Sequence, residues 1–432
     1  MNWFLLRLSL IFLCVQVSQS LASVQTVVVM PFANLSKNPA LQWINESFPE
    51  LLQDRLIWPS VNPLGRDERL IAFDRIGIPY SSRLSKASLI KIGQELDSNY
   101  LILGDFTYDG KRLQASTSIL DLRRNLLGPE VKEGGGLEDL QFIIGRVAWC
   151  IINQLDPHVS ISEEAYYARF PTIPNAALEN YIRGLTESDI SKQVRYFREA
   201  EKAYPNYPEA IFQLGKVYSL QKDYATSSLW LQRLTLRNKN YSAATFLLGL
   251  DYLQLKSYEK AAGEFQQLSQ SLPLNEIYSN LGIAMSFYGQ NEKATEAFEK
   301  ALEGDSSSAD SHFNLAYHLW RTGEFGEAEK TLRALVQRND QDGQAYYLLY
   351  KCQHALGKTT EAEASWAVAR QLTPQVDSWE SRKRIPDLFR IQSNFDETTF
   401  RLLRLEIEQL HNDKTTGQAG EQKIRGTLGR PQ

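Results

Sequence analysis

The chain has 432 residues, a length that suggests two or three domains. Apolar residues make up 43 % of the chain and charged residues 23 %, values typical of a globular protein, which argue against wholesale disorder. The 47 Lys and Arg residues against 51 Asp and Glu residues give a formal net charge of −4, which argues against a nucleic-acid-binding protein. Three cysteines and five histidines leave little material for a metal cluster or a disulfide framework.

The first 22 residues resemble a secretory signal peptide. Arg7 precedes an apolar run at 8–17, and the small residues Ser20 and Ala22 stand before a plausible cleavage site. An uncleaved membrane anchor is the alternative, but spanning a bilayer takes about 20 apolar residues, and Arg7 interrupts any longer run. We therefore expect cleavage near Ala22, no membrane span in the mature chain, and a periplasmic or secreted location.

Residues 23–157 follow the pattern of a small α/β domain. Apolar residues at strand or helix spacing, with turn residues between them, mark its elements. Strands are predicted at 24–32, 70–73 and 99–103, helices at 41–57, 85–96 and 137–155, and a hairpin at 106–120. Asp109-Gly110 suits a tight type I′ turn for the hairpin. Strands that alternate with helices predict a mixed sheet covered by helices.

Short motifs of this domain resemble a known family. The run Val28-Val-Met-Pro-Phe-Ala-Asn-Leu-Ser36 looks like the opening of the TolB amino-terminal-type (FlgO-like) domain of bacterial envelope proteins. Ile92-Gly-Gln-Glu-Leu-Asp97 and Tyr100-Leu-Ile-Leu-Gly104 are similar to later segments of that family, in the same order. The resemblance covers about residues 24–157 and implies a binding and assembly domain without catalytic residues.

Two polar features of this domain have alternative interpretations. Asn34 and Ser36 follow a strand end, where open α/β sheets commonly bind ligands, but an Asx-type turn between strand and helix is the favoured interpretation. Gly134-Gly-Gly136 follows no predicted strand and lacks the Lys-Ser/Thr of a phosphate-binding loop, so a flexible loop is predicted there.

The second half of the chain repeats with a period near 34 residues. The positions after a recurring Leu are Gly215, Gly249, Gly282, Ala316 and Tyr350, at steps of 34, 33, 34 and 34 residues. A second set lies twelve residues further on, at Ser227, Ala261, Ala294, Ala328 and Ala362. The pattern resembles the tetratricopeptide repeat (TPR), in which each unit is a pair of antiparallel helices. It predicts an all-α superhelical solenoid after the α/β domain.

The period also sets the expected boundaries of this solenoid. We expect a linker at 158–176, a degenerate capping repeat at 177–207, five repeats at 208–375, capping helices at 376–412 and a disordered tail at 413–432. Small residues such as Gly249 and Ala261 let paired helices approach closely, while Phe265 and Phe298 are expected to fill the groove presented by the next unit. No unit can bury its apolar stripe alone, so neighbouring units stack into a curved array.

The TPR resemblance implies that a partner binds in the concave groove, which the first helix of each pair lines. Helical register turns ten side chains toward this groove, and aromatic and Arg side chains are favoured as interface anchors. The candidate partner-binding residues are Phe212, Lys216, Phe246, Leu250, Phe313, Tyr317, Trp320, Arg321, Tyr347 and Lys351. Packing between adjacent helices is the alternative role for several of them, and for Phe212 and Phe246 the two interpretations have equal support.

No catalytic, cofactor-binding or metal-binding residue is predicted. His312 and His318 are six residues apart, which places them on different faces of a helix and away from metal-ligand spacing. Gly357-Lys358-Thr359 resembles the end of a phosphate-binding loop, but it occupies the turn inside a repeat. Cys150 and Cys352 lie among apolar residues of different predicted domains and are expected to be buried free thiols.

These patterns together predict a non-catalytic periplasmic scaffold or adaptor. A partner protein would bind in the repeat groove, while the α/β domain would dock on a component of the bacterial cell envelope; nucleic acid is not an expected partner. The alternative is a ligand-sensing accessory protein, whose α/β domain binds a small molecule near Asn34 and Ser36 and whose repeats relay its presence.

Overall fold

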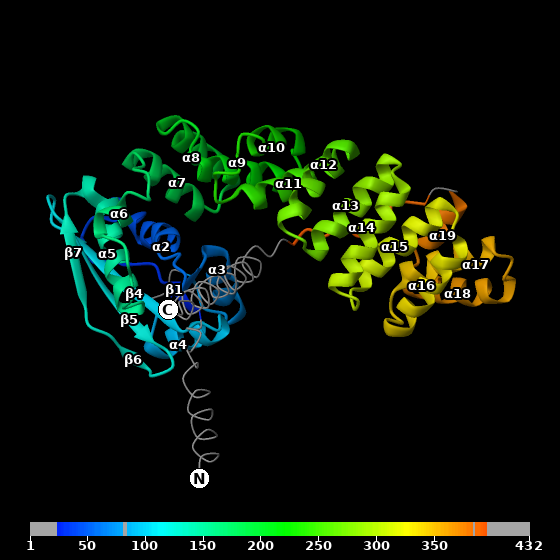
Figure 1. Cartoon of the computed structure of the whole chain (residues 1–432), viewed down its shortest axis with the longest axis horizontal. Helices are drawn as coiled ribbons and strands as arrows, with labels where there is room; N and C mark the ends of the chain where they lie inside the picture. Colours follow the sequence, from blue (N-terminus) through cyan, green and yellow to red (C-terminus); the bar gives the residue numbers. More distant parts are fainter. Residues whose placement is uncertain (1–23, 81–83, 383–384, 395–432) are drawn as a thin grey trace, which may run out of the picture. The chain divides into compact units, whose positions relative to one another are not determined.

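The computed structural model describes residues 24–80, 84–382 and 385–394 (Figure 1). The predicted signal peptide with its cleavage site near Ala22, the part of the predicted capping helices after residue 394 and the predicted tail at 413–432 lie outside these residues. The described residues divide into two compact units, one with the residues up to Lys192 and with Lys202–Tyr204, the other with Gln193–Glu201 and the residues from Pro205 onward. The first unit holds a mixed sheet and the second a long run of helices, as the sequence predicts.

The first unit is built on a seven-stranded sheet. Its strands are β1 (Gln25–Val29), β2 (Ala33–Asn34), β3 (Val61–Leu64), β4 (Tyr100–Tyr108), β5 (Leu113–Asp121), β6 (Leu126–Leu127) and β7 (Val131–Gly135). They run in the order β3-β1-β4-β5-β6, with β2 beside β4 and β7 beside β5. β1 pairs in parallel with β3 and β4, whereas β5 is antiparallel to β4, β6 and β7, so the predicted mixed sheet is confirmed.

Helices cover both faces of this sheet. The helices of this unit are α2 (Ile44–Arg55), α3 (Arg66–Arg75), α4 (Lys86–Glu95), α5 (Leu140–Leu155), α6 (Glu163–Tyr167) and α7 (Asn175–Thr186), with short 3-10 segments at Pro39–Leu41 and Leu137–Asp139; α6 and α7 pack on α5 and α2. On one face, Val28 and Leu101 pack in a cluster with Ile92 of α4. Alternate residues of a strand point to opposite faces, so Phe106 lies on the other face, where it stacks on Phe48 of α2 with ring centroids 6.4 Å apart.

The predicted strand at 70–73 is wrong. These residues lie in α3, whose buried side chains Arg69, Ala72 and Phe73 recur at helical spacing. The strand of this region is β3, which directly precedes the helix and contains Pro63. Proline weakens a strand pattern in the sequence, but β3 is at the edge of the sheet, where the missing amide hydrogen costs no ladder hydrogen bond.

Three glycines lie inside strands at positions where the sequence predicted a strand end or a loop. β4 continues through Gly104 to Tyr108, because a Cβ at residue 104 would lie only 2.4 Å from the ring of Phe32 and glycine leaves room for that ring. The flexible loop predicted at 134–136 is likewise wrong for Gly134 and Gly135, which belong to β7 and pair with β5.

The predicted hairpin between β4 and β5 is confirmed, but its turn differs from the type I′ expectation. Tyr108 pairs with Leu113, which leaves four residues in the loop instead of two. The Oδ1 atom of Asp109 accepts hydrogen bonds from the amides of Lys111 and Arg112, each at 2.8 Å. The Asp side chain therefore stabilises a longer loop that local sequence does not distinguish from a tight turn.

The stretch expected to be a linker contains a packed helix, α6. Tyr166 of α6 is fully buried, and its hydroxyl donates to the carbonyl oxygen of Arg55 at 2.7 Å. The next helix, α7, packs on α2, and the hydroxyl of Tyr181 donates to Glu50 Oε1 at 2.7 Å. Both helices are thus part of the first unit.

The second unit is a succession of helix pairs (Figure 1). After α8 (Ile190–Ala203) come α9 (Pro208–Leu220), α10 (Tyr224–Leu231), α11 (Tyr241–Gln254), α12 (Tyr258–Ser271), α13 (Asn275–Tyr288), α14 (Asn291–Gly304), α15 (Ala309–Thr322), α16 (Phe325–Arg338), α17 (Gly343–Ala355), α18 (Thr359–Leu372) and α19 (Val376–Ser381). From α9 onward each helix packs on the next, and the first helices of successive pairs also touch, as in TPR arrays. Within the described residues, no helix combines the length and apolar character needed to cross a bilayer.

Glycines of the first helices receive large side chains from their partner helices. A Cβ at Gly249 would lie 2.7 Å from Phe265, and one at Gly282 would lie 2.6 Å from Phe298. Phe298 also meets His318 of the next pair, with ring centroids 5.7 Å apart. These aromatic side chains therefore pack first within their own unit, and Phe298 also contacts the following one.

Candidate functional site

All ten predicted groove residues lie on first helices of the repeats. Phe212 and Lys216 are on α9, Phe246 and Leu250 on α11, Phe313, Tyr317, Trp320 and Arg321 on α15, and Tyr347 and Lys351 on α17. Four aromatic members are buried, with exposed fractions of 2 % for Phe246, 0 % for Phe313, 5 % for Tyr317 and 0 % for Tyr347. Packing within the protein, the alternative role that the sequence left open, therefore describes these four side chains in the structure.

Phe246 is buried by the array itself. Its ring meets that of Phe265 edge-on, with centroids 5.8 Å apart, so the packing interpretation holds for it. Phe212 and Leu250 are partly buried and pack against the same apolar core. Lys216 Nζ lies 5.9 Å from the ring centroid of Phe212 on the same helix.

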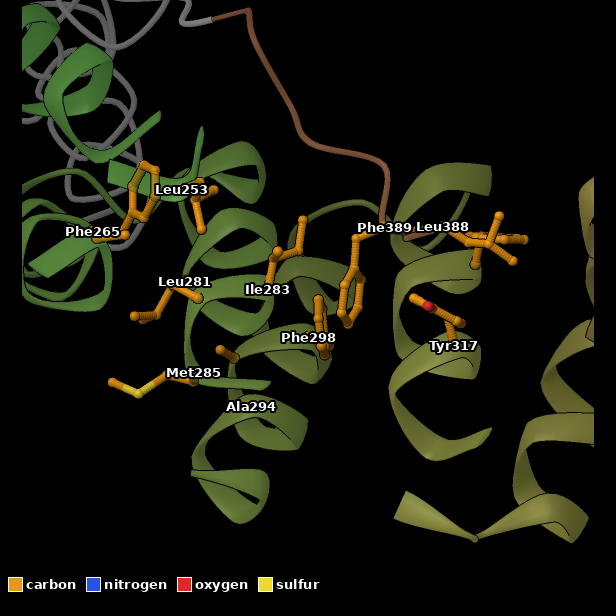
Figure 2. Close-up of a cluster of buried hydrophobic side chains, with 14 of the residues drawn as sticks. Leu253, Phe265, Leu281, Ile283, Met285, Ala294, Phe298, Tyr317, Leu388 and Phe389 are labelled. Atoms are coloured by element: carbon orange, nitrogen blue, oxygen red, sulfur yellow. The ribbon is translucent and has the colours of Figure 1, made fainter. Parts of the chain in front are cut away.

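Part of the chain itself covers the predicted groove residues of α15. Residues 385–394, which we name the return segment, contain neither helix nor strand and lie against α13, α14 and α15 (Figure 2). Figure 2 shows Phe389 pointing between Phe298 and Tyr317, whose ring centroids are 5.9 and 4.7 Å from its own. Leu388 and Phe389 are only 4 % and 9 % exposed, so the return segment is part of the hydrophobic core.

Two asparagines hold the backbone of the return segment. Asn314 Oδ1 accepts from the amide of Arg390 at 2.7 Å, and its Nδ2 donates to the carbonyl of the same residue at 2.9 Å. Asn280 makes the same pair of bonds to Gln392, at 2.9 and 2.8 Å. Asparagines at equivalent positions of adjacent repeats thus bind alternate residues, which is how an extended backbone presents its polar groups to one side.

Arg390 inserts its side chain between α15 and α17. Its Nη2 atom donates to both carboxylate oxygens of Asp342 at 2.7 Å, and its Nη1 atom donates to Asp310 Oδ1 at 3.1 Å. The guanidinium carbon lies 3.8 Å from the ring centroid of Phe313. A planar guanidinium satisfies the carboxylate and the aromatic face together, which an ammonium group does less well.

Arg321 contributes from the neighbouring turn of α15. Its guanidinium carbon lies 4.5 Å from the ring centroid of Phe287 and 5.5 Å from that of Phe389. The nearby Asp387 carboxylate is in the return segment; burial raises its pKa, while the amide hydrogen bond from Phe389 and the charge of Arg321 act in the opposite direction. We name Asn280, Phe313, Asn314, Tyr317, Arg321, Asp310 and Asp342 the docking face.

The two predicted residues of α17 are covered by α19. Tyr347 donates its hydroxyl to Glu380 Oε1 at 2.7 Å, and Lys351 Nζ donates to the same oxygen at 2.9 Å. Trp379 meets Tyr347 edge-on, with ring centroids 5.2 Å apart. Helix α19 therefore covers α17, whereas the return segment lies against α13, α14 and α15.

The polar residues of this site were not among the candidates predicted from the sequence. Asn280 and Asn314 are fully buried, and each stands two residues before the small residue of its repeat, Gly282 or Ala316. Asn disfavours a helix interior and a buried side-chain amide requires partners, so its recurrence at one repeat position was the available signal. Asp342 gave no such signal, because it is also the N-cap of α17 and accepts from the Ala345 amide at 3.0 Å.

In the first unit, Asn34 and Ser36 form the turn that the sequence favoured. Asn34 Oδ1 accepts from the amide of Ser36 at 2.9 Å and from its hydroxyl at 2.6 Å. The Asn34 amide group donates to the carbonyl of Asn38 at 3.2 Å. These bonds occupy the polar groups that the alternative hypothesis assigned to a small ligand.

The remaining reactive side chains have structural environments. His318 is fully buried between Ser286 Oγ, 2.9 Å from its Nδ1 atom, and the carbonyl of Asn291, 3.2 Å from its Nε2 atom, and burial lowers its pKa. Cys150 and Cys352 are free thiols, as predicted; Cys352 is buried, but Cys150 is only partly buried, contrary to the expectation. Gly357, in the sequence that resembles a phosphate-binding loop, has φ +74° in the turn between α17 and α18.

Comparison with known proteins gives a family match within the helical part. Residues 288–352 match the family model of the tetratricopeptide repeat. The general transcriptional corepressor trfA of Dictyostelium discoideum is 27 % identical over 139 residues, which are 31 % of this chain and 10 % of that protein. The chain thus spans about a tenth of the length of that relative.

Several solved structures are similar to part of this chain. PilF of Pseudomonas aeruginosa is 17 % identical with a TM-score of 0.39. The match covers 48 % of this chain and 97 % of PilF. YrrB, described as a TPR protein with an unusual peptide-binding site, is 14 % identical with a TM-score of 0.37. The match covers 43 % of this chain and 97 % of YrrB. A MamA fragment from Desulfovibrio magneticus RS-1 is 22 % identical with a TM-score of 0.37. The match covers 40 % of this chain and 99 % of that fragment. The family match at residues 288–352 and the succession of helix pairs thus indicate a TPR-type fold for this part of the chain.

Proposed function

We propose that this protein is a non-catalytic scaffold that binds an extended segment of a partner protein on the docking face. The observation that carries the proposal is the pair of asparagines that hold both polar groups of Arg390 and Gln392. These bonds go to the backbone, so they are available to any extended chain whatever its sequence. Buried amide groups would lose their partners if the face stayed empty, which favours an occupied state.

The location and the second attachment belong to the same proposal. The signal-peptide-like residues 1–22 support export to the periplasm, with a cut near Ala22. The TolB amino-terminal-type motifs support docking of the α/β domain on a component of the bacterial cell envelope. Mass spectrometry of the protein purified from its host tests the first point, since an uncut N-terminus contradicts export by a cleaved signal.

Pull-down from envelope extract tests the scaffold function. We compare the wild-type chain with the double variant Asn280→Ala/Asn314→Ala and with the control Gln266→Ala, which changes an exposed side chain of the second helix α12. A specific partner should be captured by the wild type and the control and lost with the double variant. Equal capture by all three chains contradicts binding through the asparagine pair.

A further inference from the structure

The side-chain contacts of the return segment define what the docking face selects. Successive residues of an extended chain point to opposite sides. Phe389 enters the aromatic cluster of Phe287, Phe298 and Tyr317, while Arg390 enters the acidic site of Asp310 and Asp342. The two sites therefore receive adjacent residues of different chemistry.

We propose that the docking face selects a partner segment with an aromatic residue followed directly by arginine, and that the return segment is an intramolecular competitor for it. This inference rests on the proposed function and specifies its partner and its control. The partner displaces residues 385–394 and takes over their backbone bonds to Asn280 and Asn314.

The acidic site gives the selection its strength. The Asp342 side chain is only 7 % exposed, and Arg390 satisfies both of its carboxylate oxygens. An apolar residue in place of arginine would leave this carboxylate buried and without its cation, a costly arrangement. Asp310 is about half exposed and adds attraction for the same positive charge.

The short connection to α19 makes the competition effective. Only residues 382–384 separate α19 from the return segment in the sequence. A short tether gives an effective concentration in the millimolar range, so a free segment of equal contacts is at a disadvantage. The apparent association constant of the partner is its intrinsic value multiplied by the fraction of molecules whose docking face is open.

A labelled copy of the segment, the peptide Ile-Pro-Asp-Leu-Phe-Arg-Ile-Gln-Ser-Asn, provides the probe. We measure its binding by fluorescence anisotropy to the full chain, to the variant Phe389→Ala/Arg390→Glu, and to Arg390→Glu alone. The single variant leaves Phe389 in the core and serves if the double variant is unstable. We expect both variants to bind the probe at least tenfold more tightly than the wild type, because Glu at 390 is repelled by Asp310 and Asp342.

Altered probes test the selectivity. Replacing the arginine of the probe by methionine should weaken its binding to the Arg390→Glu variant at least tenfold. Adding Asp342→Asn to that variant should remove most of this difference. Equal binding of the arginine and methionine probes contradicts the selection of arginine.

Two results overturn the competition. One is equal binding of the probe to the wild type and to both variants, with asparagine-dependent partner capture intact; the scaffold function then stands without the competitor. The other is a wild-type dimer in light scattering that Arg390→Glu converts to a monomer, because the segment then belongs to a second copy. Loss of asparagine dependence in the pull-down instead contradicts the scaffold function itself.

Discussion

Asp251 shows how one residue makes the stability of the repeats depend on pH. It is fully buried on α11 and accepts a hydrogen bond from Ser219 Oγ at 2.7 Å. Burial raises the pKa of this carboxyl from 3.8 to about 6, although hydrogen bonds from serines favour the ionised form. The folded state therefore binds the proton more tightly than the unfolded state does.

The sign of the effect follows from this difference. Between about pH 4 and pH 6 the folded state holds more protons, so this group's contribution to stability falls as the pH rises through that window. We expect Asp251→Asn to remove this loss, which amounts to at most about 3 kcal/mol at pH 7 for a shift of about two units. Urea unfolding from pH 4 to pH 7.5 measures it. The exposed control Asp340→Asn should follow the wild-type profile, and a parallel profile for Asp251→Asn contradicts the assignment.

Gly282 and Gly263 allow a matched test of how closely the helices of the repeats pack, because only Gly282 lies against a partner side chain. A Cβ at residue 282 would lie 2.6 Å from the ring of Phe298, whereas one at residue 263 has nothing within 4 Å. Gly282→Ala should lower the free energy of unfolding by about 1–3 kcal/mol through overpacking. Gly263→Ala should raise it by about 0.5–1 kcal/mol through helix propensity. Chemical denaturation measures both free energies of unfolding. Equal changes in the two variants would contradict the close contact between residue 282 and Phe298.

At the scale of elements, the predictions that depended on local sequence signals were right, and those that depended on an element's place in the fold were missed. α4 begins at the predicted cap, where Ser85 Oγ accepts from the Ser88 amide at 3.1 Å. β3 was missed because its proline is acceptable only at a sheet edge, and edges are not visible in the sequence. The return segment was missed for a similar reason, since its partners lie in other repeats.

Hydrogen exchange tests the attachment of the return segment. The amides of Arg390 and Gln392 donate to Asn314 and Asn280, so they should exchange more slowly than those of an open chain. Asn280→Ala/Asn314→Ala should speed their exchange by up to about tenfold, because one hydrogen bond contributes about 0.5–1.5 kcal/mol net. The amides of α16 serve as the control. Unchanged exchange at both residues contradicts the asparagine contacts.

At the scale of the molecule, the division into two units predicts separate unfolding transitions. Phe48 is fully buried in the first unit and stacks on Phe32 with ring centroids 4.0 Å apart. Phe48→Ala should cost about 3–5 kcal/mol and lower only the transition of the first unit. Gly282→Ala should lower only the other transition. Calorimetry of both variants measures this, and one transition shifted alike by both contradicts independent units.

The sequence by itself determined the mixed sheet, the period of the helix pairs and the first-helix positions of all ten candidate residues. These follow from side-chain spacing, which acts over a few residues and repeats along the chain. Only the tertiary structure decided that four of the aromatic candidates are buried and that residues 385–394 occupy the docking face. The reason is distance along the chain: Gln392 binds Asn280, 112 residues earlier, and no local periodicity records such a contact.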